Sequence, residues 1–117
     1  MKYMVIEDYE TEFTNPVMVK QNEKIIIEKE TDEEYENWFF CKKVDGSNSG
    51  WIPEEIIKKD NNYGIITEDY SAKELNVKNG FIVKGIKELN GWLWCECENT
   101  NEIGWVPIKI LKVFTEL

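Results

Sequence analysis

The sequence predicts an all-β protein built from two copies of one small, five-stranded, antiparallel barrel. The stretch Gly50-Trp51-Ile52-Pro53 returns as Gly104-Trp105-Val106-Pro107, and other anchor residues repeat around it in the same order. The apolar runs between these anchors are short, rich in β-branched residues and bounded by turn residues. Closure of each set of strands into a barrel would remove the edges that such short strands expose.

The repeat divides the chain of 117 residues into two domains, which we expect at 1–59 and 64–117. The spacers between the anchors differ in length, as surface loops on a fixed scaffold do. The polar segment 60–63 is expected to be the linker, and it is short enough to predict a fixed or semi-fixed pair. The further repeated anchors are Trp38 and Trp92, Cys41 and Cys95, and Asp8-Tyr9 and Asp69-Tyr70.

In the first copy, Asn and Glu near residue 22 and the Gly/Ser/Asn cluster before Gly50 are typical of turns, and three consecutive Ile residues are typical of a buried strand. Pro53 has no N–H to donate and should end its strand. The charge run over 30–36 predicts a solvated loop. The expected strands are 3–6, 24–28, 38–44, 51–52 and 56–58, with a hairpin arm at 17–19 and a long loop over 8–16.

The second copy follows the same order with shorter loops. Gly80 marks a turn, and Pro107 should end its strand as Pro53 does. The segment 88–91 replaces the acidic loop of the first copy. The expected strands are 64–68, 75–77, 81–86, 92–97, 104–106 and 111–113.

The composition restricts the class of partner. The net charge of −9 disfavours binding to a phosphate backbone, so we expect no nucleic acid as a partner. We expect a basic protein or peptide instead. The alternative is that the charge only keeps the protein soluble. No apolar run has the roughly 18 residues of a membrane span, so no membrane partner is expected. The first ten residues lack the order of a signal peptide, which predicts a cytoplasmic protein with reduced thiols.

The residues needed for most catalysis are missing. The chain has no His, no Gly-rich phosphate loop and no nucleophile elbow, and its paired carboxylates fall in expected loops. Cys95 and Cys97 share one face of a strand while Cys41 belongs to the other copy, which favours core Cys over a zinc site. We therefore expect no enzyme, catalytic residue, metal or cofactor.

These anchors resemble the Src homology 3 family over nearly the whole chain. The runs 5–9 and 66–70 are similar to the leading motif of that family, Trp38-Phe39 and Trp92-Leu93 to its tryptophan pair, and the two Gly-Trp-aliphatic-Pro stretches to the motif before its short 3₁₀ turn. The resemblance implies small β-barrels with a peptide-binding groove of Tyr, Trp and Pro. Two groove tyrosines of the family are replaced in each copy, by Glu7 and Ile56 or by Glu68 and Ile110.

Strand alternation predicts additional aromatic side chains on the groove face. Trp38 and Phe40 should share one face, and Phe39 and Cys41 the other. The resemblance implies that Cys41 lies inside the barrel with Ile52 opposite it, so that Phe40 points outward. Phe40 would then lie beside Trp51 and, in the second copy, Trp94 beside Trp105. These rings either enlarge a binding platform or are buried where the two barrels meet.

Acidic residues flank both expected grooves and would read a Lys or Arg beside an extended segment, or else form solvated loops that bind nothing. In the first copy the candidate groove residues are Tyr9, Glu10, Glu12, Glu33, Glu34, Trp38, Phe40, Trp51, Pro53 and Ile56. In the second copy they are Tyr70, Glu74, Glu88, Trp92, Trp94, Trp105, Pro107 and Ile110.

Three functional hypotheses stay open at this point. The first is a binding module that holds a basic or proline-containing segment of another protein. The second is an acidic inhibitor or immunity-type protein that caps the basic surface of one folded partner. The third is a structural role in which the aromatic faces cover each other, with the chain a monomer or a weak homo-oligomer.

Overall fold

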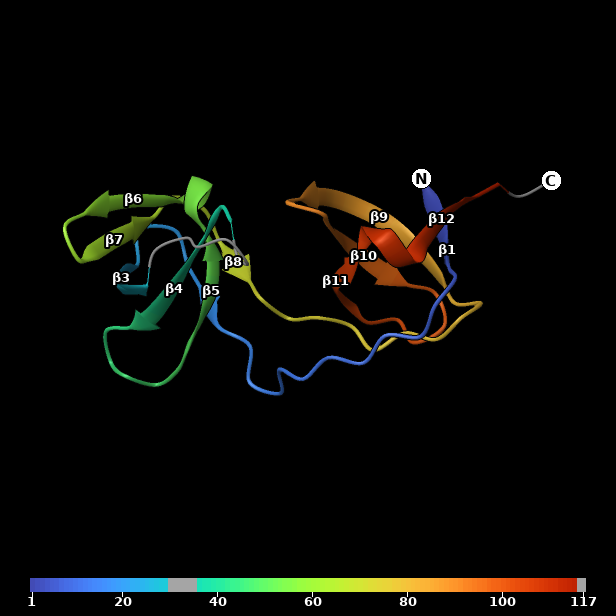
Figure 1. Cartoon of the computed structure of the whole chain (residues 1–117), viewed down its shortest axis with the longest axis horizontal. Helices are drawn as coiled ribbons and strands as arrows, with labels where there is room; N and C mark the ends of the chain where they lie inside the picture. Colours follow the sequence, from blue (N-terminus) through green and yellow to red (C-terminus); the bar gives the residue numbers. More distant parts are fainter. Residues whose placement is uncertain (30–35, 116–117) are drawn as a thin grey trace. The chain divides into compact units, whose positions relative to one another are not determined.

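The computed structural model describes residues 1–29 and 36–115 and confirms the all-β class. Its strands form two five-stranded antiparallel sheets and one two-stranded sheet, with no α-helix in the described ranges (Figure 1). Short 3₁₀ turns, η1 (Glu54–Ile56) and η2 (Ile108–Ile110), follow the two prolines that end β5 and β11.

The strands of the first sheet are ordered β11-β10-β9-β1-β12, and those of the second β5-β4-β3-β7-β6. The first sheet contains β1 (Lys2–Val5), β9 (Ile82–Leu89), β10 (Trp92–Cys97), β11 (Ile103–Pro107) and β12 (Leu111–Phe114). The second contains β3 (Lys24–Lys29), β4 (Trp38–Lys43), β5 (Ser49–Pro53), β6 (Ile57–Asp60) and β7 (Tyr63–Ile66). The two-stranded sheet pairs β2 (Met18–Val19) with β8 (Tyr70–Ser71). In the described residues the edge strands of neither large sheet pair with each other, so the expected barrel closure is not seen in the ladders.

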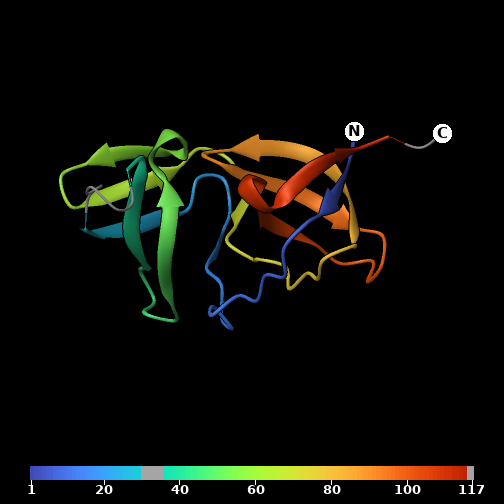
Figure 2. The ribbon, with the colours of Figure 1, turned by 45° about the vertical axis from the view of Figure 1, so that its right-hand side comes forward.

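The compact units of the structure differ from the predicted domains. One unit, here the continuous unit, is Asn15–Ala72; the other, the discontinuous unit, joins Met1–Thr14 (the N-terminal arm) to Lys73–Leu117. Strand β1 of the arm lies between β9 and β12, whereas β7, which leads the second sequence copy, lies between β3 and β6. The two copies have exchanged their leading strands, which corrects the boundaries 1–59 and 64–117. The two crossing segments, drawn in blue and in yellow, can be followed in Figure 1 and Figure 2.

The expected linker explains this exchange, because it is a tight hairpin turn. Asp60 pairs with Tyr63, leaving only Asn61 and Asn62 outside the ladder. Asn61 has φ 57°, in the left-handed region that Asn tolerates better than most residues. A two-residue turn joins neighbouring antiparallel strands, so β7 has to pair with β6 and complete the sheet it follows.

Hydrogen bonds at the turns repeat crosswise between the copies. The backbone N–H of Asn79 donates to Asp8 Oδ1 at 2.7 Å, and that of Gln21 donates to Asp69 Oδ1 at 2.8 Å. In each case an Asp of one sequence copy caps a turn of the other. The Asp residues of the repeated Asp-Tyr anchors therefore hold the exchanged segments in register.

One pair of positions distinguishes the packing of the two units. Gly85 and Ile27 hold equivalent register positions, each opposite the buried Cys of the next strand. A Cβ on Gly85 would lie 3.2 Å from Tyr3 Cε2, so Gly85 leaves room for the Tyr3 ring on the incoming strand. In the continuous unit the incoming strand has Gly64 at that place, where a Cβ would lie 2.5 Å from Ile57 Cγ2. In the discontinuous unit the incoming strand has the large residue (Tyr3) and the receiving strand the small one (Gly85), whereas in the continuous unit the incoming strand has Gly64 and the receiving strand Ile27. Each leading strand therefore fits the unit in which it lies.

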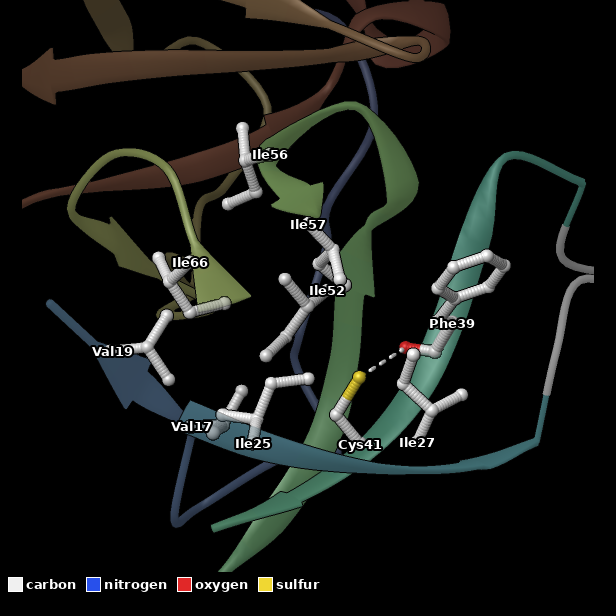
Figure 3. Close-up of a cluster of buried hydrophobic side chains, with 10 residues drawn as sticks. All are labelled: Val17, Val19, Ile25, Ile27, Phe39, Cys41, Ile52, Ile56, Ile57 and Ile66. Carbon is white, nitrogen blue, oxygen red and sulfur yellow. Dashed lines mark hydrogen bonds between the residues drawn. The ribbon is translucent and has the colours of Figure 1, made fainter. Parts of the chain in front are cut away.

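Each unit has its own hydrophobic core. Phe39, Cys41 and Ile52 are buried, which confirms the inward face expected from the family position of Cys41 and from strand alternation. The core of the continuous unit, shown in Figure 3, consists of Val17, Val19, Ile25, Ile27, Phe39, Cys41, Ile52, Ile56, Ile57 and Ile66. The core of the discontinuous unit consists of Val5, Leu75, Val77, Val83, Leu93, Cys95, Cys97, Val106 and Ile110.

Candidate functional site

The best-defined polar and aromatic cluster lies in the discontinuous unit, around Tyr9 and Trp92. Their ring centroids are 6.1 Å apart in an edge-to-face arrangement with an interplanar angle of 76°. The Tyr9 hydroxyl donates a short hydrogen bond to Glu74 Oε1. Trp92 opens β10 and pairs with Pro107, which is buried. Three segments far apart in the sequence therefore build one site.

Backbone pairing fixes the positions of Tyr9 and Glu74. Tyr9 forms an isolated antiparallel bridge with Val77, and Glu74 forms a parallel bridge with Trp105. The N–H of Thr11 donates to Asn76 Oδ1 at 2.8 Å, extending the contact beyond Tyr9. The side chains of the site are thus carried by hydrogen-bonded backbone.

The electrostatic environment of Tyr9 is negative. Partial burial raises the pKa of the Tyr9 hydroxyl, and the hydrogen bond to Glu74 together with the charges of Glu74 and Glu12 raises it further. Two carboxylates therefore act on one phenol beside the Trp92 ring. Such a cluster attracts a cation that can contact both the carboxylates and the aromatic face.

The equivalent region of the continuous unit has a different chemistry. Val19 pairs with Tyr70 as Val77 pairs with Tyr9, so Pro16 takes the place of Glu74. Asn48 Nδ2 donates to the Pro16 carbonyl at 3.3 Å. Pro16 therefore offers no carboxylate at the position that Glu74 holds in the discontinuous unit.

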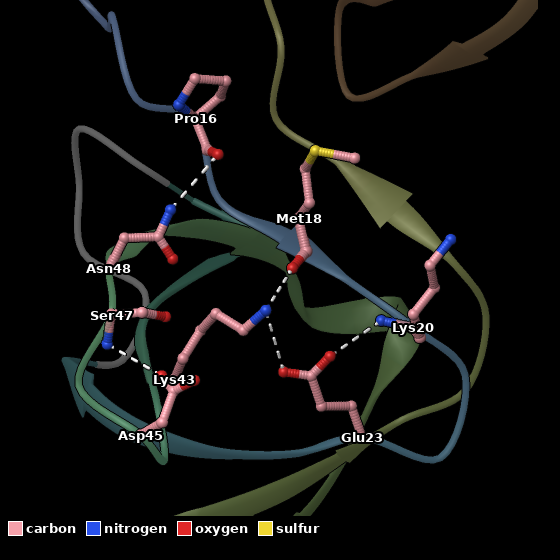
Figure 4. Close-up of polar contacts among 8 residues, drawn as sticks. All are labelled: Pro16, Met18, Lys20, Glu23, Lys43, Asp45, Ser47 and Asn48. Atoms are coloured by element: carbon pink, nitrogen blue, oxygen red, sulfur yellow. Dashed lines mark hydrogen bonds and ion pairs between the residues drawn. The ribbon is translucent and has the colours of Figure 1, made fainter.

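Two carboxylates of the continuous unit lie close to lysines of the same unit, and Figure 4 shows one of these pairs, Lys43 and Glu23. Lys43 Nζ lies 3.4 Å from Glu23 Oε2 and donates to the Met18 carbonyl at 2.9 Å. Lys20 Nζ lies 3.8 Å from Asp69 Oδ2. Both carboxylates thus already have a lysine of the same unit nearby.

Each unit also carries an outer aromatic pair. The ring centroids of Phe40 and Trp51 are 5.2 Å apart at 67°, and those of Trp94 and Trp105 are 5.2 Å apart at 60°. This confirms that Phe40 lies beside Trp51 and Trp94 beside Trp105, as predicted. Trp105 is only 6% exposed, so its ring offers little area to a ligand. Lys29 Nζ lies 5.9 Å from the Trp51 centroid, which places a cation beside the pair in the continuous unit.

The structure divides the candidate residues differently from the sequence copies. Tyr9, Glu10 and Glu12 belong to the discontinuous unit with Trp92, and Tyr70 belongs to the continuous unit with Trp38. This corrects the grouping of Tyr9 with Trp38 and of Tyr70 with Trp92, because the leading strands are exchanged. Glu33 and Glu34 lie outside the described residues.

Other candidates have a structural role. Ile56 and Ile110 are 4% and 3% exposed and belong to the two cores, so they do not line an open groove. Pro53 and Pro107 are also buried. Glu88 is exposed in β9 opposite Leu93. Sequence reasoning missed Asn76, which accepts a hydrogen bond from the N–H of Thr11 near Tyr9, and Pro16, which holds the register position of Glu74.

The three cysteines lie in the cores, as predicted. Burial raises the pKa of Cys41 to about 12 and that of Cys95 to about 12, with nearby Glu28 and Cys97 as smaller causes. Cys41 Sγ donates to the Phe39 carbonyl at 3.5 Å, and Cys95 Sγ to the Gly104 carbonyl at 3.6 Å. Within 1–29 and 36–115, no three His, Cys, Asp or Glu side chains are arranged to hold a metal ion. No helix in the described part of the chain has the length and apolarity that a membrane crossing requires.

Comparisons with protein-family models, curated proteins and solved structures found no match to this chain.

Proposed function

We propose that this chain is a non-enzymatic binding module of two Src homology 3-like units, and that the discontinuous unit holds a basic segment of another protein. The observation that carries the proposal is the cluster of Tyr9, Glu74 and Trp92, with Glu12 close enough to affect the hydroxyl of Tyr9. The strand that ends at a proline before a 3₁₀ turn, present in both units, supports the likeness to that family.

The chemistry of the cluster favours a Lys or Arg side chain of the partner. Its charged group would contact Glu74 and Glu12, while its aliphatic stem or an adjacent residue would pack on Trp92. The Tyr9 hydroxyl already donates to Glu74, so the carboxylate is oriented before the partner arrives. Exposed ion pairs contribute roughly 0.2–1 kcal/mol each, so the charges mainly select the partner and the rings supply most of the affinity.

The continuous unit supports a different use of the same framework. With Pro16 in place of Glu74, and Glu23 and Asp69 near lysines of the same unit, its Trp38 region suits an apolar or proline-containing segment. The two units would then read two neighbouring parts of one partner, and their joint binding would exceed that of either alone.

The test is a titration of the full chain with synthetic peptides that differ in one Lys, followed by Trp fluorescence and calorimetry. The variant Glu12→Gln/Glu74→Gln should weaken binding of the Lys peptide by about tenfold and leave the Lys-free peptide unaffected. The control is Glu96→Gln/Glu102→Gln, which removes two exposed carboxylates of the same unit away from Tyr9 and should change neither affinity. Equal effects of both double variants would show that only net charge matters.

A second function has the net charge of −9 in its favour: an inhibitor that caps the basic surface of one folded partner. Such a complex should bury roughly 1,200–2,000 Å², and its association rate should fall steeply as salt is added. Binding of a folded basic protein with no binding of any linear peptide at micromolar concentration would replace the first proposal by this one.

A further inference from the structure

Strand β1 and Thr11 of the N-terminal arm contact segments far along the chain. Lys2 pairs with both Lys84 and Phe114, and the N–H of Thr11 donates to Asn76, 65 positions away. Val5 is fully buried in the core of the discontinuous unit. The arm is therefore a central part of a unit to which it is not connected by neighbouring sequence.

The arm reaches its unit through one exposed stretch. Glu10 and the residues 12–15 are exposed, and beyond them the chain enters the continuous unit. The continuous unit takes all five strands of its large sheet from residues 15–72. Neither the pairing of β1 nor the packing of Val5 depends on which molecule supplies the arm, so an arm from a second copy would make the same contacts.

The packing restricts where a second copy's arm could dock. Tyr3 needs the space that Gly85 leaves, whereas the equivalent position of the continuous unit is Ile27, with Gly64 on its incoming strand. An arm from another molecule therefore fits the slot between β9 and β12 and no equivalent slot in the continuous unit. In a reciprocal exchange between two molecules, each arm fills this slot in the other molecule and no slot is left empty.

We propose that two copies of this chain exchange their N-terminal arms and form a closed dimer. In that dimer Tyr9 and Glu12 come from one molecule, and Trp92 and Glu74 from the other, so each cluster is built by both chains. A short tether holds its own arm at an effective concentration on the order of millimolar, so micromolar protein stays monomeric and the dimer appears after refolding at higher concentration or when the tether is shortened.

The first test uses two full-chain variants, one with a disabled arm and the other with a disabled slot. Val5→Asp disables the arm, and Val83→Asp disables the slot, because both side chains are fully buried in the same core. Isotope-labelled Val5→Asp protein by itself should lack the amide signals of the folded discontinuous unit. Addition of an equimolar amount of unlabelled Val83→Asp protein at millimolar concentration should restore them, because its intact arm fills the intact slot.

The matched control is unlabelled Val5→Asp/Val83→Asp protein, which has neither an intact arm nor an intact slot and should restore nothing. Restoration by the Val83→Asp protein alone, together with a heterodimer in sedimentation, supports the exchange. A mixture that stays monomeric with the signals still absent overturns it.

The second test shortens the tether by deletion of residues 12–14, which are exposed and follow the Thr11 contact. Sedimentation should then find a dimer at micromolar concentration, while the undeleted chain stays monomeric. A shortened chain that is monomeric and retains the amide signals of the discontinuous unit overturns the proposal. If the deletion prevents folding, the complementation of the two Asp variants still decides.

Discussion

The continuous and discontinuous units are built from repeated anchors but differ in connection, packing and charge. One contains its whole sheet in Asn15–Ala72, whereas the other draws β1 from the opposite end of the chain. The large side chain lies on the incoming strand in one unit, as Tyr3, and on the receiving strand in the other, as Ile27. The comparison teaches that repeated anchors define a framework, while a turn and one pair of positions decide which segments complete it.

The largest effect should come from cutting the chain at sequence rather than structural boundaries. In the fragment 1–59, β1 would have to take the place of β7, and Tyr3 would then be overpacked against Ile27 and Ile57. In the fragment 64–117, β7 would have to take the place of β1, and Gly64 beside Gly85 would leave a cavity. A unit of this size is only marginally stable, so neither fragment should unfold cooperatively. The fragment 15–72 should do so, as measured by circular dichroism against urea. Equal stability of 1–59 and 15–72 would contradict the packing argument.

A smaller effect is expected from interchanging the distinguishing pair within the full chain. Gly85→Ile should destabilise the discontinuous unit by about 1–3 kcal/mol, because the new side chain meets the Tyr3 ring. The double variant Tyr3→Gly/Gly85→Ile copies the pattern of the other unit and should recover part of the loss. Denaturant titration of the four proteins gives the coupling, expected at roughly 0.5–3 kcal/mol. Strict additivity would mean that the two residues do not constrain each other.

The two tryptophans should differ in their effect on a basic ligand. Trp92→Ala removes the ring beside Tyr9 and should weaken binding of the Lys peptide by about 2 kcal/mol. Trp38→Ala alters the unit that has Pro16 in place of Glu74, so it should affect that peptide little. Calorimetry with both variants checks the difference, and similar losses would show that the two units bind the same feature of the peptide.

The smallest effect concerns alkaline pH. The pKa of Tyr9 is raised in the folded protein, so the folded state keeps this proton after the unfolded state begins to lose it near pH 10. The stabilisation that the Tyr9 hydroxyl provides is fully present below pH 10. The free energy of unfolding of the discontinuous unit should fall as the pH rises above that value. Tyr9→Phe should flatten this part of the pH profile, measured by urea titration. An unchanged slope would mean that another group titrates there.

Much of the framework could be predicted from the sequence. Strand alternation grouped Phe39 with Cys41 and Trp38 with Phe40, because side-chain direction on a strand depends on parity. The family position of Cys41 then indicated which face is inside and placed Phe40 beside Trp51. The strand positions followed from β-branched runs and turn residues.

The exchange could not be predicted from the anchors, because both copies present the same anchor residues and either leading strand satisfies the pattern. The turn at Asn61-Asn62 and the positions of Gly64 and Gly85 contained the missing information. The site was predicted in residue type but not in grouping, since Tyr9 meets Trp92 only after the exchange. Ile56 was assigned to the groove by family position, whereas the 3₁₀ turn directs it into the core.

The hairpin at Asn61-Asn62 has a consequence for how such a gene can change. A deletion that removes one repeat leaves a leading segment and a body that were each matched to a different companion. A single repeat cut out at this boundary would therefore keep all the anchor residues, but its leading strand would not match the packing of its other strands. Each repeat thus depends on the other for the leading strand that fits its packing.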